Sequence, residues 1–252
     1  MVIGLIGAGN MGSALARGLG EPLLVVDADR SRAEGLADEL GGEAPDSAAA
    51  LCERADIVIL AHKPAQLDEV AGELGTRPRA VASILGGTHV AAIERAYPEV
   101  PAYRFMPNLA VEARQGVICY APGARAADGP ERELLELMGR AGTVIELDEP
   151  LIEPATALMG CAPAFFALVV EALVDAGVRH GLPSDRASLM ASQTMAGTAA
   201  LLTEGGLDPR ELRRRVTSPG GSTARGVAEL ERGGVRAAFA DAVAAVVEAG
   251  RR

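Results

Sequence analysis

The feature that most constrains this chain is a glycine pattern that directly follows an apolar segment. Residues 2–6 have the short apolar pattern of a buried strand, Gly7-Ala8-Gly9-Asn10-Met11-Gly12 comes next, and residues 11–19 carry apolar side chains at helical spacing. In such a strand, loop and helix, the first glycine permits a tight turn, the second lets the backbone approach a pyrophosphate, and the third permits close helix packing. The pattern predicts dinucleotide binding, with Gly7, Gly9, Asn10, Met11 and Gly12 as cofactor contacts.

Short apolar segments alternate with helical patterns up to about residue 147. Strands are predicted at 2–6, 23–26, 57–61, 80–85, 102–105, 116–120 and 143–147, and helices at 11–19, 30–40, 47–54, 66–74, 90–96 and 130–139. This alternation indicates a parallel sheet covered by helices. The predicted fold class is therefore α/β, with a doubly wound Rossmann-type dinucleotide-binding domain over residues 1–149.

Strand patterns stop after residue 147, and Ala-rich and Leu-rich helical segments take over. Helices are predicted at 154–159, 163–180, 185–203, from 208 onward, at 224–231 and at 235–249. Long helices with extensive apolar faces in so small a domain often bury those faces against a second subunit. We therefore expect residues 150–252 to form an all-α substrate-binding and dimerisation domain, in a homodimer or a higher oligomer.

The end of the second predicted strand bears on the choice of cofactor. Asp27 lies about 20 residues after Gly7, where an acidic side chain hydrogen-bonds the ribose of NAD and repels the 2′-phosphate of NADP. The next residues, Asp29, Arg30 and Ser31, include an Arg and a Ser that can hold this phosphate if Asp27 turns away. All four are candidate cofactor contacts, and both NADH and NADPH stay open.

Polar and glycine residues follow the next predicted strands as well. Open α/β sheets bind ligands at the carboxyl ends of their strands. Further cofactor contacts are therefore predicted at His62, Lys63, Pro64, Gly86, Met106, Pro107 and Asn108. Lys63 has two alternative interpretations, a solvated surface side chain or the base of a hydroxyacid dehydrogenase.

A polar loop with the sequence V-T-S-P-G-G-S-T, residues 216–223, leads into a predicted helix of the C-terminal half. Backbone amides at a helix start can bind a small carboxylate, and the hydroxyls of Ser218, Ser222 and Thr223 can hydrogen-bond a reacting heteroatom. A plain N-capped turn is the alternative interpretation of the same spacing.

Composition narrows the remaining classes of function. The formal net charge of −10 disfavours a general role in binding nucleic acid or anionic membranes. The most apolar stretch, Leu158–Val170, is short for a membrane span and contains Pro163. The three cysteines are far apart, and the three histidines share no ligand spacing, so we expect neither disulfides nor a metal site. These features together predict a cytoplasmic protein.

Taken together, the motifs resemble those of the pyrroline-5-carboxylate reductase family. Residues 212–231, L-R-R-R-V-T-S-P-G-G-S-T-A-R-G-V-A-E-L-E, are similar to that family's signature, and the glycine loop, Lys63-Pro64, residues 104–108 and residues 175–183 agree with it. The resemblance implies hydride transfer from NAD(P)H to the C=N bond of 1-pyrroline-5-carboxylate, giving L-proline. It implies substrate contacts at Gly220, Gly221, Ser222 and Thr223, catalytic hydroxyls at Ser218 and Thr223, with Thr223 bonded to the ring nitrogen, and a dimer formed by the helical domain.

The chain departs from the family pattern near the predicted site. Leu109-Ala110 replaces the usual Thr-Pro after Met-Pro-Asn, and residues 159–165 lack the two serines and the tyrosine of S-G-S-G-P-A-Y. Thr88-His89 follows Gly86-Gly87 where the family favours small apolar residues. The alternatives are therefore a non-catalytic nucleotide-sensing relative and a hydroxyacid dehydrogenase that uses Lys63.

Overall fold

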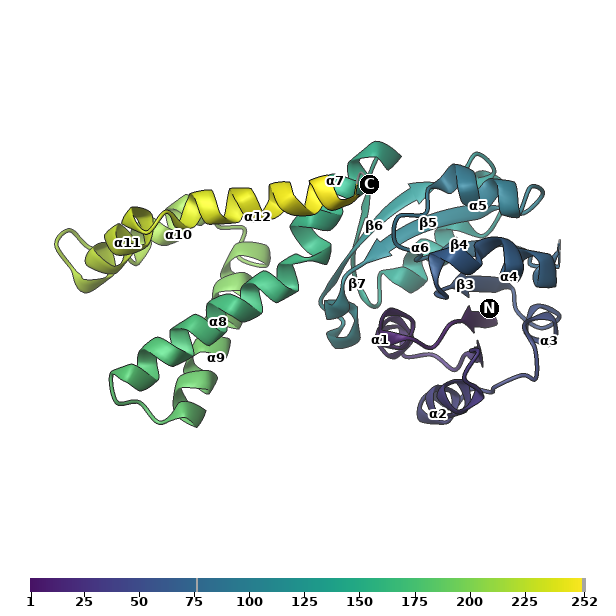
Figure 1. Cartoon of the computed structure of the whole chain (residues 1–252), viewed down its shortest axis with the longest axis horizontal. Helices are drawn as coiled ribbons and strands as arrows, with labels where there is room; N and C mark the ends of the chain where they lie inside the picture. The colour runs from purple at the N-terminus through teal and green to yellow at the C-terminus, as the bar shows by residue number, and fades with distance from the viewer. Residues whose placement is uncertain (76, 251–252) are drawn as a thin grey trace. The chain divides into compact units, whose positions relative to one another are not determined.

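A seven-stranded sheet organises the first part of the chain in the computed structural model, which describes residues 1–75 and 77–250 (Figure 1). The strands are β1 (Ile3–Ile6), β2 (Leu24–Val26), β3 (Ile57–Leu60), β4 (Val81–Ser83), β5 (Ala102–Pro107), β6 (Gly116–Pro122) and β7 (Gly142–Glu146). Their spatial order is β2-β1-β3-β4-β5-β6-β7, so the chain reverses direction across the sheet after β2. Each predicted strand is present in the described residues.

The sheet is mixed, whereas the strand pattern predicted a parallel one. Strands β1 to β5 run parallel, but β6 pairs antiparallel with β5, with Phe105 opposite Tyr120, and β7 runs parallel to β6. The chain between β5 and β6 holds only the short 3₁₀ helix η2 (Leu109–Ala113). A parallel pair needs a crossover of a dozen or more residues, so this short connection forces the reversal.

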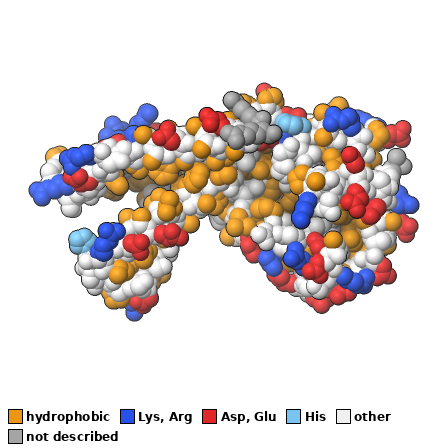
Figure 2. Space-filling view, viewed as in Figure 1, with side chains coloured by type: hydrophobic (Ala, Val, Ile, Leu, Met, Phe, Trp, Pro, Cys, Tyr) orange, Lys and Arg blue, Asp and Glu red, His pale blue; other side chains and the backbone are white. Residues whose placement is uncertain are grey.

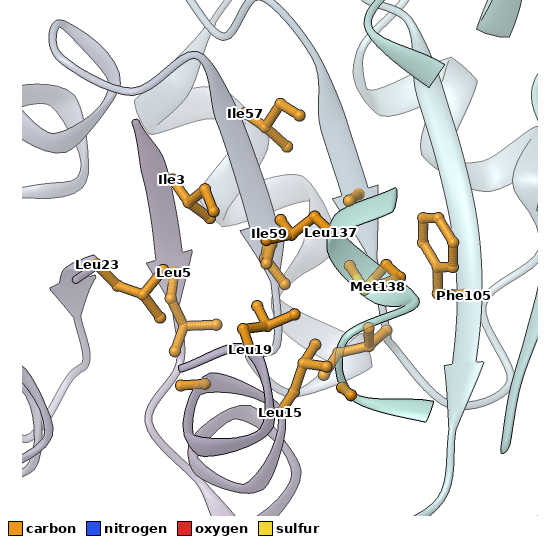
Figure 3. Close-up of a cluster of buried hydrophobic side chains, with 14 of the residues drawn as sticks. Ile3, Leu5, Leu15, Leu19, Leu23, Ile57, Ile59, Phe105, Leu137 and Met138 are labelled. Carbon is orange, nitrogen blue, oxygen red and sulfur yellow. The ribbon is translucent and has the colours of Figure 1, made fainter. Parts of the chain in front are cut away.

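Helices cover both faces of the sheet, which confirms the doubly wound prediction. The helices α1 (Asn10–Leu19), α2 (Arg30–Leu40) and α6 (Glu131–Met138) pack on one face, and α3 (Ala48–Cys52), α4 (Leu67–Leu74) and α5 (Val90–Ala96) pack on the other. On the first face, leucines of α1 meet Met138 of α6 and Ile59 of β3 (Figure 3). Burying this apolar surface supplies most of the stability of the unit.

A short irregular helical segment follows β7 and packs back against the sheet. It consists of η4 (Glu149–Leu151), α7 (Ile152–Ala155) and one π-helical turn, η5 (Thr156–Gly160). Ile152 and Met159 are buried with Cys119 of β6. Because of this packing, the compact units divide after Cys161, whereas the sequence placed the domain boundary at residues 149 and 150.

The second unit begins at Ala162 and consists of helices. They are α8 (Ala162–Arg179), α9 (Ser184–Thr203), α10 (Pro209–Arg215), α11 (Ser222–Arg232) and α12 (Val235–Gly250). Within residues 162–250 only Ala162 and Ala187 are buried. Apolar side chains gather along its surface (Figure 2), among them Phe166, Leu168, Leu173, Leu189, Met190 and Phe239. A unit without a core of its own needs another protein or lipid surface to bury these side chains.

The apolar stretch around α8 is longer than the sequence indicated. By length and composition alone, the helical run Glu149–Arg179 is long and apolar enough to cross a membrane, and 17% of its most apolar 18-residue window is buried. Pro163 does not end this run, because it lies in the first turn of α8, where a helix needs no amide donor.

Candidate active site

The three glycines of the first loop differ in what an added side chain would contact. Gly7 has a φ of 107°, and a Cβ there would lie 2.5 Å from the carbonyl carbon of Ala61. A Cβ on Gly12 would overlap the carbonyl oxygen of Gly7. By contrast, a Cβ on Gly9 would meet no described atom within 4 Å. The fold therefore requires Gly7 and Gly12, whereas the space beside Gly9 is free for a bound group.

The N-terminus of α1 fits an anionic group. Gly9 is its N-cap residue, and among the described residues no side chain caps the first turn. The first amides of a helix have no partner inside the helix, and the helix dipole places partial positive charge there. Asn10 is exposed and Met11 half-buried in this turn. The turn therefore has the free amides and the room that a pyrophosphate needs.

Asp27 lies beside this loop at the end of β2. Its Oδ2 accepts a hydrogen bond from the amide of Ala8 at 2.7 Å, and its Oδ1 accepts one from the amide of Asp29 at 2.8 Å. Both carboxylate oxygens are therefore fixed by backbone donors. The structure brings Asp27 next to the glycine loop, as the spacing predicted.

The polar side chains that follow Asp27 already have hydrogen-bonding partners. Ser31 donates through its hydroxyl to Asp29 at 2.6 Å, and this hydrogen bond lowers the pKa of Asp29. Arg30 forms ion pairs with Glu34 and Asp46, each at 2.7 Å. The Arg and the Ser that the sequence offered as phosphate ligands thus bond carboxylates in this structure, and their contact with the cofactor stays a prediction.

The carboxyl ends of β3 and β4 carry the next predicted contacts. Lys63 and Pro64 are exposed, and Gly86 is exposed after β4. The Nδ1 atom of His62 lies 2.9 Å from the carbonyl oxygen of Lys63, while Nε2 is buried without a partner among the described residues. Burial lowers the pKa of His62, which keeps the ring neutral at pH 7. Lys63 has no described contact that marks it as a base.

A pocket of about 460 Å³ opens between these two strand ends. Pro64, in the turn before α4, and Asp68, in the first turn of α4, line it on one side, and Gly87, His89 and Arg95 line it from the other side. It lies on the rim where the sequence placed the cofactor contacts. The pocket therefore adds a concave surface to the predicted cofactor edge.

Asn108, predicted as a cofactor contact, forms hydrogen bonds that join two segments of the backbone. Its Nδ2 donates to the carbonyl oxygen of Met159 in the π turn at 3.1 Å, and its Oδ1 accepts from the amide of Val117 at 3.1 Å. The residue four positions after Met159 is Pro163, which has no amide hydrogen to donate to this carbonyl, and Asn108 supplies the donor. Its neighbours Met106 and Pro107 end β5 at the same edge, Met106 half-buried and Pro107 buried.

A buried ion cluster beside this edge was missed by the sequence analysis. Arg104 is 1% exposed, and its guanidinium donates to Glu149 at 3.0 Å and to Glu153 at 2.6 Å. Glu149 also accepts from the amide of Val90, so it caps the start of α5. The cluster fixes the loop after β4 and the segment after β7 to the sheet. An arginine inside the apolar run of β5 was the one signal in the sequence.

The loop before α11 has the geometry of an anion site in the helical unit. Gly220 has a φ of 71°, Gly221 is the N-cap residue, and no side chain among the described residues caps the helix. A Cβ on Gly221 would overlap the hydroxyl oxygen of Ser218. Ser222 and Thr223 are exposed in the first turn. The observed geometry is thus an open helix start with hydroxyls beside it, rather than a capped turn.

Comparison with known proteins agrees with both units. Residues 149–252 match the family described as pyrroline-5-carboxylate reductase dimerisation, and residues 2–87 match NADP oxidoreductase coenzyme F420-dependent. The pyrroline-5-carboxylate reductase of Methanosarcina acetivorans is 36% identical over 252 residues, which cover 96% of this chain and 93% of that protein. The chain belongs to the pyrroline-5-carboxylate reductase family.

Solved structures of the pyrroline-5-carboxylate reductase family have the same fold. The Coxiella burnetii enzyme has a TM-score of 0.89 at 29% identity, covering 99% of this chain and 97% of that chain. The Plasmodium falciparum pyrroline carboxylate reductase, solved with NADP bound, has a TM-score of 0.84 at 26% identity, with the same coverage. The predicted fold class and family are confirmed.

Proposed function

We propose that this chain reduces the C=N bond of 1-pyrroline-5-carboxylate with NAD(P)H to give L-proline. One observation carries the proposal. The chain belongs to this family and has two helices whose first turns are open, α1 after Gly9 and α11 after Gly221. Each provides unpaired amides for an anion, one in each unit of the chain. The first fits a dinucleotide pyrophosphate and the second a small carboxylate.

The N-terminal unit holds the cofactor, which supplies a hydride when bound. The amides after Gly9 hold the pyrophosphate, and Asp27 lies where the ribose hydroxyls are bound in folds of this kind. His62, Lys63, Pro64 and Gly86 line the same edge of the sheet. Met106 and Pro107 stay in the proposed contact set, and Asn108 contributes by fixing the segment that ends at Gly160.

The helical unit holds the imine. The amides of Ser222 and Thr223, next to Gly220 and Gly221, bind its carboxylate, and the Thr223 hydroxyl hydrogen-bonds the ring nitrogen with Ser218 beside it. A protonated imine is already an electrophile. Positioning and anion binding can therefore supply most of the catalysis, without a dedicated base such as Lys63.

The direct test is a crossed assay of both cofactors. Purified protein with 1-pyrroline-5-carboxylate is expected to oxidise NADH or NADPH and to form proline, with no activity on 2-hydroxy acids and NAD(P). Binding of cofactor without turnover of any imine would favour the nucleotide-sensing alternative. Turnover of a 2-hydroxy acid that disappears in Lys63→Met would favour the hydroxyacid dehydrogenase.

A single substitution separates folding from cofactor binding in the glycine loop. Gly9→Ala is expected to leave the unfolding midpoint nearly unchanged, because the added Cβ meets no described atom, but to weaken cofactor binding at least about tenfold. Gly7→Ala is the matched control, since it places a side chain at a φ of 107° and is expected to destabilise the protein by about 1–3 kcal/mol. Thermal melting and cofactor titration check both variants. Unchanged cofactor binding in Gly9→Ala would contradict the pyrophosphate site.

The exposed apolar faces of the helical unit are covered by a second copy of the chain. The double variant Phe166→Ser/Leu173→Ser removes two side chains of α8 that are 54% and 57% exposed. Dimer dissociation constants are expected to rise on the order of 10²-fold or more. Sedimentation equilibrium checks this, with Val2→Ser, 44% exposed on the other unit, as the control. A monomeric wild-type protein at micromolar concentration, or one that partitions into vesicles, would contradict the assignment.

A further inference from the structure

The surroundings of Asp27 bear on which nicotinamide cofactor this chain uses. NADP differs from NAD by a phosphate on the adenosine ribose, and a phosphate monoester carries close to two negative charges at pH 7. In Rossmann-type folds this phosphate lies at the end of the second strand. Here that position is the end of β2, which Asp27 follows.

The carboxylate of Asp27 is held in place. It accepts one hydrogen bond from the amide of Ala8 in the glycine loop and one from the amide of Asp29. If the Asp27 side chain turned away, both amides would lose their acceptor. Hydrogen bonds to a charged group are among the stronger hydrogen bonds in proteins, so this rotation is costly. The geometry therefore works against the rearrangement that a phosphate at this position would require.

The nearby cations are also occupied. Arg30 is shared between Glu34 and Asp46, and Arg32 lies 3.4 Å from Asp29. Together with Asp27, this neighbourhood holds four carboxylates and two guanidinium groups. Its net charge is therefore negative, and a phosphate placed here would meet like charge.

From these contacts we propose that Asp27 is the specificity-determining residue for the cofactor, and that this chain prefers NADH to NADPH. The inference deepens the proposed function and rests on it, since it names the form of the cofactor which that reaction uses. Asp27 accepts hydrogen bonds from the ribose hydroxyls of NADH, and the acidic neighbourhood excludes the 2′-phosphate. The chain is then expected to differ from the Plasmodium falciparum neighbour, which was solved with NADP.

Direct binding measurements test this without turnover. Titration of the wild-type protein with each reduced cofactor, followed by nicotinamide fluorescence, is expected to give a dissociation constant at least about tenfold lower for NADH than for NADPH. Asp27→Ser is expected to reduce the ratio of the NADPH to the NADH dissociation constant about tenfold or more, because it weakens the binding of NADH and strengthens the binding of NADPH. Higher salt is expected to narrow the wild-type ratio through screening.

Asp38→Ser provides the matched control. Asp38 is an exposed carboxylate near the other end of α2, so its removal changes the net charge equally and should leave the ratio unchanged. Equal or tighter NADPH binding by the wild type, or an unchanged ratio in Asp27→Ser, would overturn the inference. Binding is measured without turnover. Preferential NADH binding in a protein that reduces no imine would therefore contradict the proposed function but not the proposed cofactor preference.

Discussion

Replacing Arg104 by leucine is expected to lower the free energy of unfolding by about 3 kcal/mol or more, the cost of removing one partner from a buried ion pair. The reason is the pair of carboxylates that remains. Glu149 and Glu153 are each 28% exposed beside a guanidinium that is 1% exposed, so their hydration is incomplete. Without Arg104, Glu153 loses its ion pair, and Glu149 keeps, among the described residues, only the amide of Val90 and the imidazole of His89, 3.7 Å away. Urea denaturation followed by circular dichroism, at one fixed protein concentration, measures the loss.

Two further variants separate charge from packing at Arg104. Arg132→Leu removes an arginine that is 77% exposed beside Glu133 and Glu136, and it is expected to change the free energy of unfolding by no more than about 0.5 kcal/mol. Adding Glu153→Gln to Arg104→Leu is expected to recover part of the loss, because one of the two carboxylate charges is gone. A loss below about 1 kcal/mol for Arg104→Leu, or no recovery in the double variant, would show that the cluster contributes little.

Removing the hydroxyl of Thr223 is expected to reduce kcat on the order of 10²-fold, the effect of deleting one well-placed hydrogen-bonding group in an active site. Thr223 is exposed at the start of α11 and caps nothing described there, so Thr223→Ala should leave the fold and the cofactor dissociation constant unchanged. Steady-state kinetics with 1-pyrroline-5-carboxylate and cofactor titrations measure the two effects separately.

Thr223→Ser tests whether the hydroxyl itself is responsible. Serine keeps the oxygen and loses only a methyl group, so kcat within a few-fold of the wild type is expected. If the alanine variant retained full turnover, Thr223 would have no place beside the ring nitrogen. A rise in KM with kcat preserved would instead limit its role to substrate binding.

Local patterns in the sequence predicted most of the α/β unit. Apolar runs of four to six residues became strands because both sheet faces are covered, and the helical spacing of Leu15 and Leu19 in α1 matches their burial against the sheet. Strand direction was the exception. Periodicity is the same in parallel and antiparallel strands, so only the short connection at residues 108–115 marked the reversal at β6.

The candidate site was predicted less completely, and for a physical reason. Glycines after strands and the loop before α11 are local signals, and each lies at an open helix start. The partners of Arg104 lie 45 and 49 residues away in sequence, where spacing carries no information. For the same reason the sequence did not indicate the hydrogen bond from Asn108 to a carbonyl 51 residues away, and the contact of Asn108 with the cofactor stays a prediction.

The scarcity of buried residues in the helical unit has a consequence for the synthesis of the protein. The last strand of the sheet ends at Glu146, so the α/β unit can fold on the ribosome while the helices are still being made. Those helices then emerge with apolar faces that no part of their own unit covers. Each newly made chain is expected to depend on chaperones that bind its apolar helices until it associates with a second copy of the chain. Rapid overexpression is expected to produce aggregates in which the N-terminal unit is the protease-resistant part.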